Sequence, residues 1–147
     1  MNEKGKNSRL AFFVLVIAII FGIYSVVAMK PQVPDDLGEF FPPAEEISYL
    51  SVTAEGEGKG EGVTRVQEEL QALHTIAEGI AIKDEQKAYV GKDYEGTLYH
   101  LEMGYANSTY DFYIATDGSI YHANGKYEIA DEADTTALFA WFDSLIA

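Results

Sequence analysis

The first strong feature in the pattern of apolar and polar positions is an uninterrupted apolar segment near the amino terminus. Residues Leu10–Met29 contain no charged side chain, and 13 of these 20 residues are Leu, Ile, Phe or Val. At a rise of about 1.5 Å per residue, a helix of this length spans roughly 30 Å, the thickness of the hydrocarbon layer of a membrane. The pattern therefore predicts a single transmembrane helix.

The carboxyl-terminal half shows a period of two, which is typical of half-buried strands. Apolar and polar side chains alternate from residue 98 to residue 105, and three turn-forming dipeptides follow. These dipeptides are Asn107-Ser108, Asp117-Gly118 and Asn124-Gly125. Asp-Gly and Asn-Gly readily form two-residue hairpin loops, so we expect a four-stranded antiparallel β-meander that ends near residue 130. The side chains expected on its core face are Tyr99, Leu101, Met103, Tyr105, Phe112, Ile114 and Tyr121.

Two helices are predicted beside the meander. The first runs from Arg65 to Glu78, because apolar residues recur at helical spacing between a capping box of Thr64 and Gln67 and a closing Gly79. The second begins with Asp134 or Thr135 as its cap. Its apolar residues are Leu138, Phe139, Trp141, Phe142, Leu145 and Ile146. A helix this apolar must be covered by the sheet, so we expect it to belong to the core.

These elements predict an α+β protein in which an amino-terminal transmembrane helix precedes a small domain, an antiparallel β-meander packed against two helices. Residues 1–9 form a basic tail, residues 10–29 the transmembrane helix, residues 30–43 a Pro-rich stalk and residues 44–147 the domain. Within the domain we expect a first strand over residues 47–54 and a flexible, glycine-rich loop over residues 55–62. Phe40 and Phe41 are unusual in a stalk, and either dock on the domain or lie among the lipid headgroups.

The charges beside the apolar segment predict its orientation. The basic residues that precede it are Lys4, Lys6 and Arg9. Only Lys30 follows it before a run of acidic residues. The positive-inside rule then places the amino terminus in the cytoplasm and the domain outside the cell membrane.

A cleaved signal peptide is the alternative interpretation of this segment. Val26 and Ala28 are suitable small residues before a cleavage site at Met29. The apolar stretch is, however, longer than the roughly 7 to 15 residues of a signal peptide's hydrophobic core. We do not expect a lipoprotein anchor, because the sequence has no cysteine to carry the lipid.

The part of the chain after Lys30 is strongly acidic. It contains six basic and 23 acidic residues, which gives a formal charge of −17. Such a field repels phosphate groups, so we expect neither nucleic-acid binding nor a domain that lies flat on an anionic bilayer. The absence of cysteine excludes disulfides, thiol catalysis and zinc–thiolate sites, and favours the envelope of a Gram-positive bacterium.

The predicted turns also predict which residues of the meander lie opposite one another. With a two-residue loop in each hairpin, Ala115 pairs with Ile120, Tyr113 with His122, and His122 with Tyr127. This register places Glu102, Tyr113, His122 and Tyr127 in one row across the face opposite the core.

The row suggests two kinds of site. His100, Glu102 and His122 are candidate ligands for zinc or copper, because His100 lies diagonal to the row and imidazole and carboxylate groups bind these metals. Tyr113 and Tyr127 form a possible binding face for sugars or peptides. The alternative is a polar outer face on which these side chains only pack across strands. We find no nucleophile paired with a base, so we expect neither an enzyme nor a cofactor.

The stretch Tyr110–Tyr121, with the sequence YDFYIATDGSIY, resembles the strand, turn and strand of PepSY-type extracytoplasmic domains. The general layout is similar to small single-span proteins of Gram-positive bacteria with domains of unknown function. The PepSY resemblance implies inhibition or regulation of envelope enzymes. We therefore expect a membrane-tethered binding or regulatory module that acts on an envelope protein. A binding domain for a divalent cation or a wall glycan is the alternative, and an envelope hydrolase is a distant third.

The topology is testable in intact protoplasts of a strain that carries the chain with an amino-terminal tag. Added protease is expected to remove the domain after Lys30 and to leave the tag protected, because the basic residues hold the amino terminus inside. Immunoblots against the tag and the domain measure both results. Digestion of the tag in intact protoplasts would contradict the predicted orientation.

Overall fold

The computed structural model describes residues 14–20, 33–57, 59–88, 91, 93–123 and 125–147. The chain divides into two units, Met1–Gln32 and Val33–Ala147. In the first unit, residues 14–20 form a helix with exposed side chains, and the rest of the predicted membrane segment lies outside the described residues. None of the helices among the described residues has both the length and the apolar character needed to cross a membrane.

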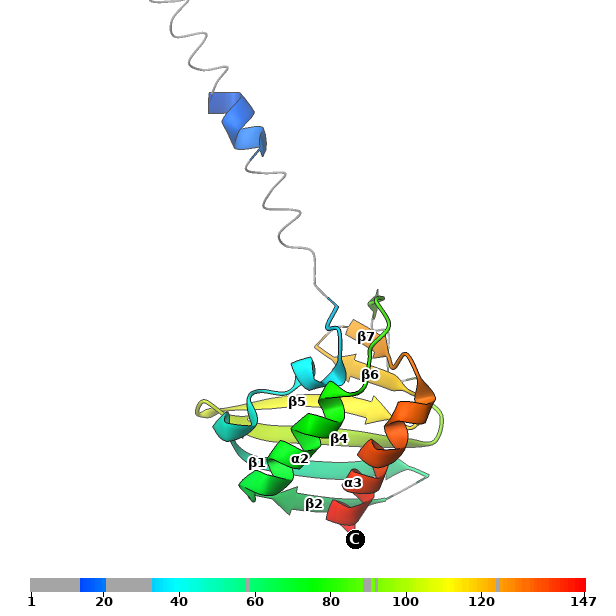
Figure 1. Cartoon of the computed structure of the whole chain (residues 1–147). Helices are drawn as coiled ribbons and strands as arrows, with labels where there is room; N and C mark the ends of the chain where they lie inside the picture. Colours follow the sequence, from blue (N-terminus) through cyan, green and yellow to red (C-terminus); the bar gives the residue numbers. More distant parts are fainter. Residues whose placement is uncertain (1–13, 21–32, 58, 89–90, 92, 124) are drawn as a thin grey trace, which may run out of the picture. The chain divides into compact units, whose positions relative to one another are not determined.

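The second unit is built on a seven-stranded antiparallel sheet with the strand order β2-β1-β4-β5-β6-β7-β3 (Figure 1). The strands are β1 (Ile47–Gly56), β2 (Gly60–Thr64), β3 (Lys87–Ala88), β4 (Thr97–Tyr105), β5 (Ser108–Ala115), β6 (Ser119–His122) and β7 (Gly125–Glu128). Strands β4 to β7 are the predicted meander, so the α+β fold class is confirmed. The predicted first strand joins this sheet beside β4, and β2 and β3 extend it at its two edges.

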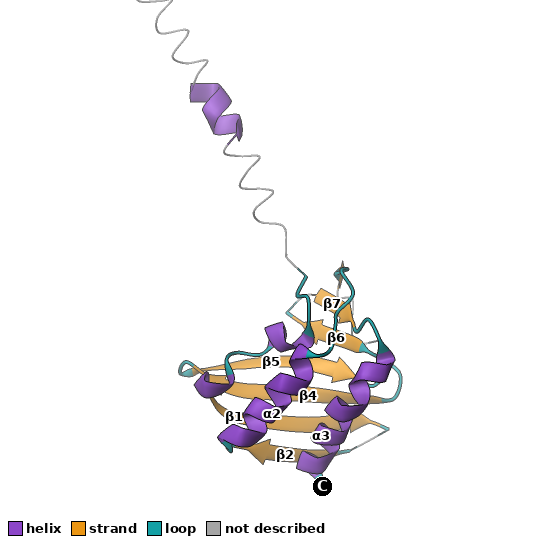
Figure 2. Cartoon of the chain, viewed as in Figure 1, coloured by secondary structure: helices purple, strands orange, loops and turns teal. Residues whose placement is uncertain are grey.

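The two longer helices of the second unit lie on the same face of the sheet, as Figure 2 shows. They are α2 (Gln67–Glu78) and α3 (Thr136–Ile146). The side chains that they bury are Leu70, Leu73 and Ala77 from α2, and Leu138 and Phe142 from α3. The prediction that the carboxyl-terminal helix belongs to the core is therefore confirmed.

Helix α3 crosses the edge strand β2, where two glycines permit a close approach. A Cβ atom on Gly62 would overlap the carbonyl oxygen of Leu145, and one on Gly60 would overlap the side chain of Ile146. The prediction of a flexible loop over residues 55–62 is wrong from Gly60 onwards, because β2 begins there. Strand β2 passes directly beneath the end of α3, where only a residue without a side chain fits. This close approach explains why these two strand positions are glycine.

The predicted stalk is also wrong over most of its length. Residues 35–46 form what we call the strap, which contains the 3₁₀ helices η1 (Leu37–Phe40) and η2 (Ala44–Glu46). Leu37 donates a backbone hydrogen bond to Ile80 at 2.9 Å, and Ile82 donates one to Asp35 at 3.0 Å. The strap is thus tied to the segment that follows α2, and is not an extended linker.

The strap fills the middle of the core with aromatic rings. Phe40 and Phe41 are buried, and their ring centroids lie 5.8 and 5.1 Å from that of Phe112 on β5. Of the two positions considered for these phenylalanines, the structure has the one in which they dock on the domain. Asp36 stabilises the turn before them, since its carboxylate accepts a hydrogen bond from the backbone of Glu39 at 3.2 Å.

The hairpin between β4 and β5 has a different loop from the predicted one. Ala106 and Asn107 form it, with φ values of 49° and 62°, instead of Asn107-Ser108. The register consequently differs by two residues, and His100 lies opposite Tyr113. A shift of two keeps each side chain on its predicted face.

The two later hairpins also differ. Three residues connect Ala115 to Ser119, with Gly118 at a φ of 93°, so Tyr113 lies opposite Tyr121 and not opposite His122. In the next hairpin Ala123 has the positive φ, 52°, whereas Gly125 belongs to β7 and lies opposite His122. The predicted pairing of His122 with Tyr127 is wrong.

Helix α2 begins two residues later than predicted, and without the predicted capping box. Val66 is its N-cap, and the Gln67 side chain donates to the carbonyl oxygen of Ala44 in the strap at 2.6 Å. The Thr64 hydroxyl accepts from the backbone of Val66 at 3.1 Å and donates to the Glu69 carboxylate. The capping box does not form because the Gln67 side chain is hydrogen-bonded to the strap.

Replacing Phe41 by alanine tests the role of the strap. The full chain in nonionic detergent micelles is expected to lose about 3–5 kcal/mol of unfolding free energy, because a buried phenylalanine is removed from a packed core. Denaturant titration followed by Trp141 fluorescence measures the change. The matched control is Glu45→Ala on the exposed surface of η2, for which we expect a change within about 0.5 kcal/mol. Equal stability of the two variants would show that the strap is a tether and not part of the core.

Candidate functional site

The sheet has a core face and a second face, which we call the outer face, and no helix among the described residues covers the latter. The outer face collects side chains that alternate with the buried ones along each strand. Its residues on the central strands are Tyr49, Ser51 and Thr53 of β1, Leu98, His100 and Glu102 of β4, and Thr109, Asp111 and Tyr113 of β5. Its neighbours towards the edges are Glu61 and Val63 of β2, Tyr121 of β6 and Lys126 of β7.

The structure does not bring the predicted metal ligands together. His100 and Glu102 lie on the outer face, but the one-residue shift between β5 and β6 turns His122 to the core face. Within the described parts of the chain, no group of three or more histidine, cysteine, aspartate or glutamate side chains is arranged to hold a metal ion. The row of His122 and Tyr127 with Glu102 and Tyr113, which the predicted register required, does not form.

His122 and Tyr127 contribute to the core instead. The Phe40 ring lies 5.9 Å from the His122 ring and 5.2 Å from the Tyr127 ring, edge to face in both cases. The Nε2 atom of His122 also lies 3.4 Å from the hydroxyl oxygen of Tyr110. Burial raises the pKa of Tyr110 to about 12. Tyr127 is buried, so it does not form the predicted binding face with Tyr113.

The outer face carries two carboxylates directly opposite each other, Glu102 on β4 and Asp111 on β5. Like charges in this position destabilise a sheet. Each carboxylate has one neutral or basic partner. The Tyr49 hydroxyl donates to Glu102 at 3.0 Å, and His100 Nε2 donates to Asp111 at 2.9 Å.

Aromatic rings border this carboxylate pair. The His100 ring stacks on the Tyr113 ring at a centroid distance of 4.3 Å and an interplanar angle of 12°. The hydrogen bond to Glu102 raises the pKa of Tyr49, because the neutral phenol is the donor. Sequence reasoning missed Tyr49, since its place beside Glu102 depends on the pairing of β1 with β4. The cluster therefore combines negative charge with flat aromatic surface.

A small depression lies next to this cluster, between β5 and β6. Its volume is about 180 Å³. It is lined by Asp111, Phe112, Tyr113, Tyr121 and Ala123. Tyr121 is almost wholly buried and packs with Leu98 and Ala115. It was predicted on the core face, and the one-residue shift places it on the outer face.

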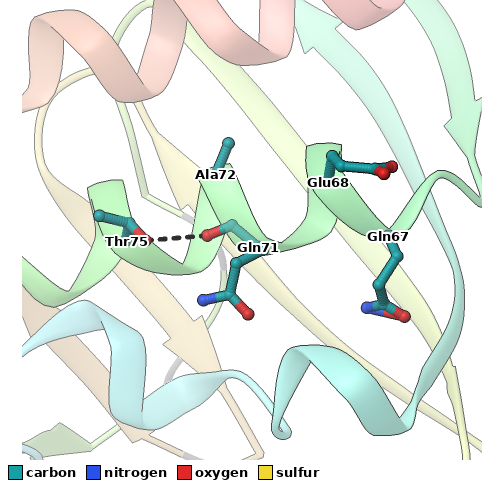
Figure 3. A pocket seen from close by; sticks show the side chains of 5 residues that line it. All are labelled: Gln67, Glu68, Gln71, Ala72 and Thr75. Carbon is teal, nitrogen blue, oxygen red and sulfur yellow. Dashed lines mark hydrogen bonds between the residues drawn. The ribbon is translucent and has the colours of Figure 1, made fainter.

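A larger, open hollow of about 480 Å³ lies along the exposed surface of α2 (Figure 3). Its lining residues are Gln67, Glu68, Gln71, Ala72 and Thr75. Two of these already bond within the fold, since Thr75 donates to the Gln71 carbonyl at 3.0 Å and Gln67 donates to Ala44. The hollow has no aromatic wall and one ionisable side chain, so it offers less specific chemistry than the outer face.

Comparison with known protein families, with curated proteins and with solved structures gives no match to this chain. The resemblance of residues 110–121 to PepSY-type domains therefore stays a prediction. In this structure the stretch comprises parts of β5 and β6, and supplies Asp111, Tyr113 and Tyr121 to the outer face.

Replacing Glu102 by glutamine tests whether the carboxylate pair serves the fold. We expect the unfolding free energy to rise by about 0.2–1 kcal/mol, because the like-charge contact with Asp111 disappears while the amide oxygen still accepts from Tyr49. Thermal unfolding of the full chain at low salt measures this gain, which should shrink as salt is added. The matched control is Glu61→Gln, which removes one charge from the same face opposite the uncharged Thr53. A loss of stability in the Glu102 variant alone would contradict the interpretation.

Proposed function

We propose that this protein is a membrane-tethered, extracytoplasmic binding or regulatory module that engages an envelope protein through the outer face of its sheet. The apolar segment at residues 10–29 and the basic residues before it support the tether and the orientation. The proposed function is non-catalytic.

The carboxylate pair on the outer face is the observation that carries this proposal. Glu102 and Asp111 are placed where their charges repel across neighbouring strands, and the fold gains nothing from that repulsion. A destabilised arrangement of this kind is one that binding and active sites often require, and its removal commonly costs function. Tyr49, His100 and Tyr113 surround the pair and hold it in a defined geometry.

The chemistry of this cluster favours a partner with a basic surface. Carboxylates bind arginine and lysine side chains through charge-assisted hydrogen bonds, and tyrosine and histidine rings offer faces for cation–π contacts. The formal charge of −17 after Lys30 would also steer a basic partner towards the domain and speed its association. The Asp111 side chain is 57% exposed and that of Glu102 is half-buried, so a partner reaches the carboxylate pair without rearrangement of the sheet.

The two alternatives have less support. A divalent cation needs several convergent oxygen or nitrogen ligands, and the described residues provide no such group. A wall glycan needs an aromatic-lined groove, whereas the aromatic-lined depression measures about 180 Å³, below the roughly 300–1,000 Å³ of common ligand pockets. A protein partner requires only a flat surface with fixed charges.

Site-specific photocrosslinking in native membranes tests the proposal. A photoreactive benzophenone amino acid replaces Thr109, which is exposed on β5 of the outer face, or Gln71, which is exposed on α2. We expect a discrete crosslinked product from position 109 and none from position 71. The product should weaken in a variant that also carries Glu102→Gln and Asp111→Asn, because the charges that attract the partner are gone.

Two crosslinking patterns would contradict the proposed binding face. One is a crosslink from position 71 without one from position 109, which would assign binding to the helical face. The other is a product from position 109 that is unchanged by loss of both carboxylates. Mass spectrometry of the product identifies the partner, and a partner without a basic surface would refute the proposed chemistry.

A further inference from the structure

The depression on the outer face exists because β5 and β6 pair over only a short length. Two residue pairs connect the strands, Tyr113 with Tyr121 and Ile114 with Ile120. Beyond these two pairs, towards Asp111 and Ala123, the backbones of β5 and β6 are no longer paired. The space between the strands is lined on the outer face by Asp111, Tyr113, Tyr121 and Ala123.

The lining combines one carboxylate with two phenol rings. The Asp111 side chain is 57% exposed and stands at the rim, while Tyr121 is 2% exposed and forms the floor. A carboxylate accepts up to about four hydrogen bonds, so the bond from His100 leaves Asp111 able to accept more. The half-buried ring of Tyr113 provides an aromatic wall beside it.

The electrostatic surroundings of the depression favour a cation. On the β7 side, the Lys126 ammonium already lies 5.8 Å from the centre of the Tyr121 ring, which shows that this ring accepts a positive charge. Burial raises the pKa of Tyr121, and the carboxylates of Asp117 and Asp93 also raise it, while its hydrogen bonds with Ser119 and the Asp93 backbone lower it. Asp111 is the one charged side chain among the residues that line the depression, so the lining favours a cation over an anion.

We propose that this depression is a recognition pocket for a single arginine side chain presented by the protein partner. The inference rests on the proposed function and identifies the group that the outer face recognises. The guanidinium forms hydrogen bonds with the Asp111 carboxylate and lies against the Tyr113 ring, above the floor made by Tyr121.

Arginine fits these features better than lysine does. Its planar guanidinium presents a fork of donors that matches a carboxylate, and the same plane stacks on an aromatic ring. A lysine ammonium is a compact, strongly hydrated charge that gains less from a flat wall. The small volume suits one side-chain head and excludes an extended ligand.

The test uses the ¹⁵N-labelled full chain in nonionic detergent micelles. Three probes are titrated in turn: N-acetyl-arginine amide, N-acetyl-lysine amide and N-acetyl-citrulline amide, the neutral isostere of arginine. We expect saturable shifts of the amide signals of Tyr113, Tyr121 and Ala123 with the arginine probe. The lysine probe should bind more weakly, and the citrulline probe should cause no saturable shift, because it lacks the charge.

Four variants identify the groups responsible. Asp111→Asn is expected to weaken arginine binding by about tenfold or more, through loss of the charged acceptor. Tyr113→Phe should keep binding because the ring is retained, whereas Tyr113→Thr should lose it while preserving strand propensity. Glu61→Gln removes a charge from the same face outside the depression, and should leave the affinity within about twofold. Unchanged dispersion of the amide signals verifies that each variant is folded.

The outcomes separate the pocket from the proposed function. Equal weakening by Asp111→Asn and Glu61→Gln would mean that only the general field attracts arginine, and would overturn the pocket. Equal shifts with arginine and citrulline would overturn it as well. Failure of arginine to bind, with the crosslink from position 109 retained, refutes the pocket and leaves the binding module in place. Arginine binding without any crosslink supports the pocket and refutes the proposed envelope partner.

Discussion

The contact between the strap and the centre of the sheet is the interaction on which the other features depend. Phe40 and Phe41 bring two rings within 6 Å of Phe112, and thereby exclude water from the middle of the core face. Side chains on a strand alternate between faces, so burial of Phe112 obliges Asp111 and Tyr113 to point outward. The cluster on the outer face is therefore a direct consequence of aromatic packing on the opposite face.

Alternation made the faces of β4 and β5 predictable, but the turn-forming dipeptides did not predict how the hairpins close. Two alanines, Ala106 and Ala123, adopt positive φ values that local preference assigns to Gly or Asn. A shift of two residues leaves the faces intact, which is why Tyr99 and Leu101 were placed correctly. The shift of one residue after Ala115 exchanges the faces of β6. The predicted metal site failed for this reason, because it needed His122 on the same face as His100 and Glu102.

Two other differences arise because long-range contacts override local composition. Proline and aspartate around residues 31–43 resemble a solvated linker, yet Leu37 and Phe40 gain more from burial than an extended chain would gain from hydration. The glycines at positions 60 and 62 resemble a loop, but they are the residues that α3 requires beneath its last turn. Neither effect leaves a periodic signal, since each depends on an element far away in the sequence. The carboxyl-terminal helix was predictable because its own residues are too apolar for solvent.

The separation of the two faces also affects how substitutions in β5 act. Phe112 and Ile114 lie within the closed core, and their loss would remove packing that no other element replaces. Asp111 and Tyr113 are the neighbours of Phe112 in the sequence. They contribute little to the packing of the core face, because their side chains lie on the outer face. The carboxylate of Asp111 even opposes pairing with β4 through its neighbour Glu102. Strand β5 thus alternates core side chains with the outer-face side chains of the proposed binding site, so a substitution at Asp111 leaves the packing of Phe112 and Ile114 in place.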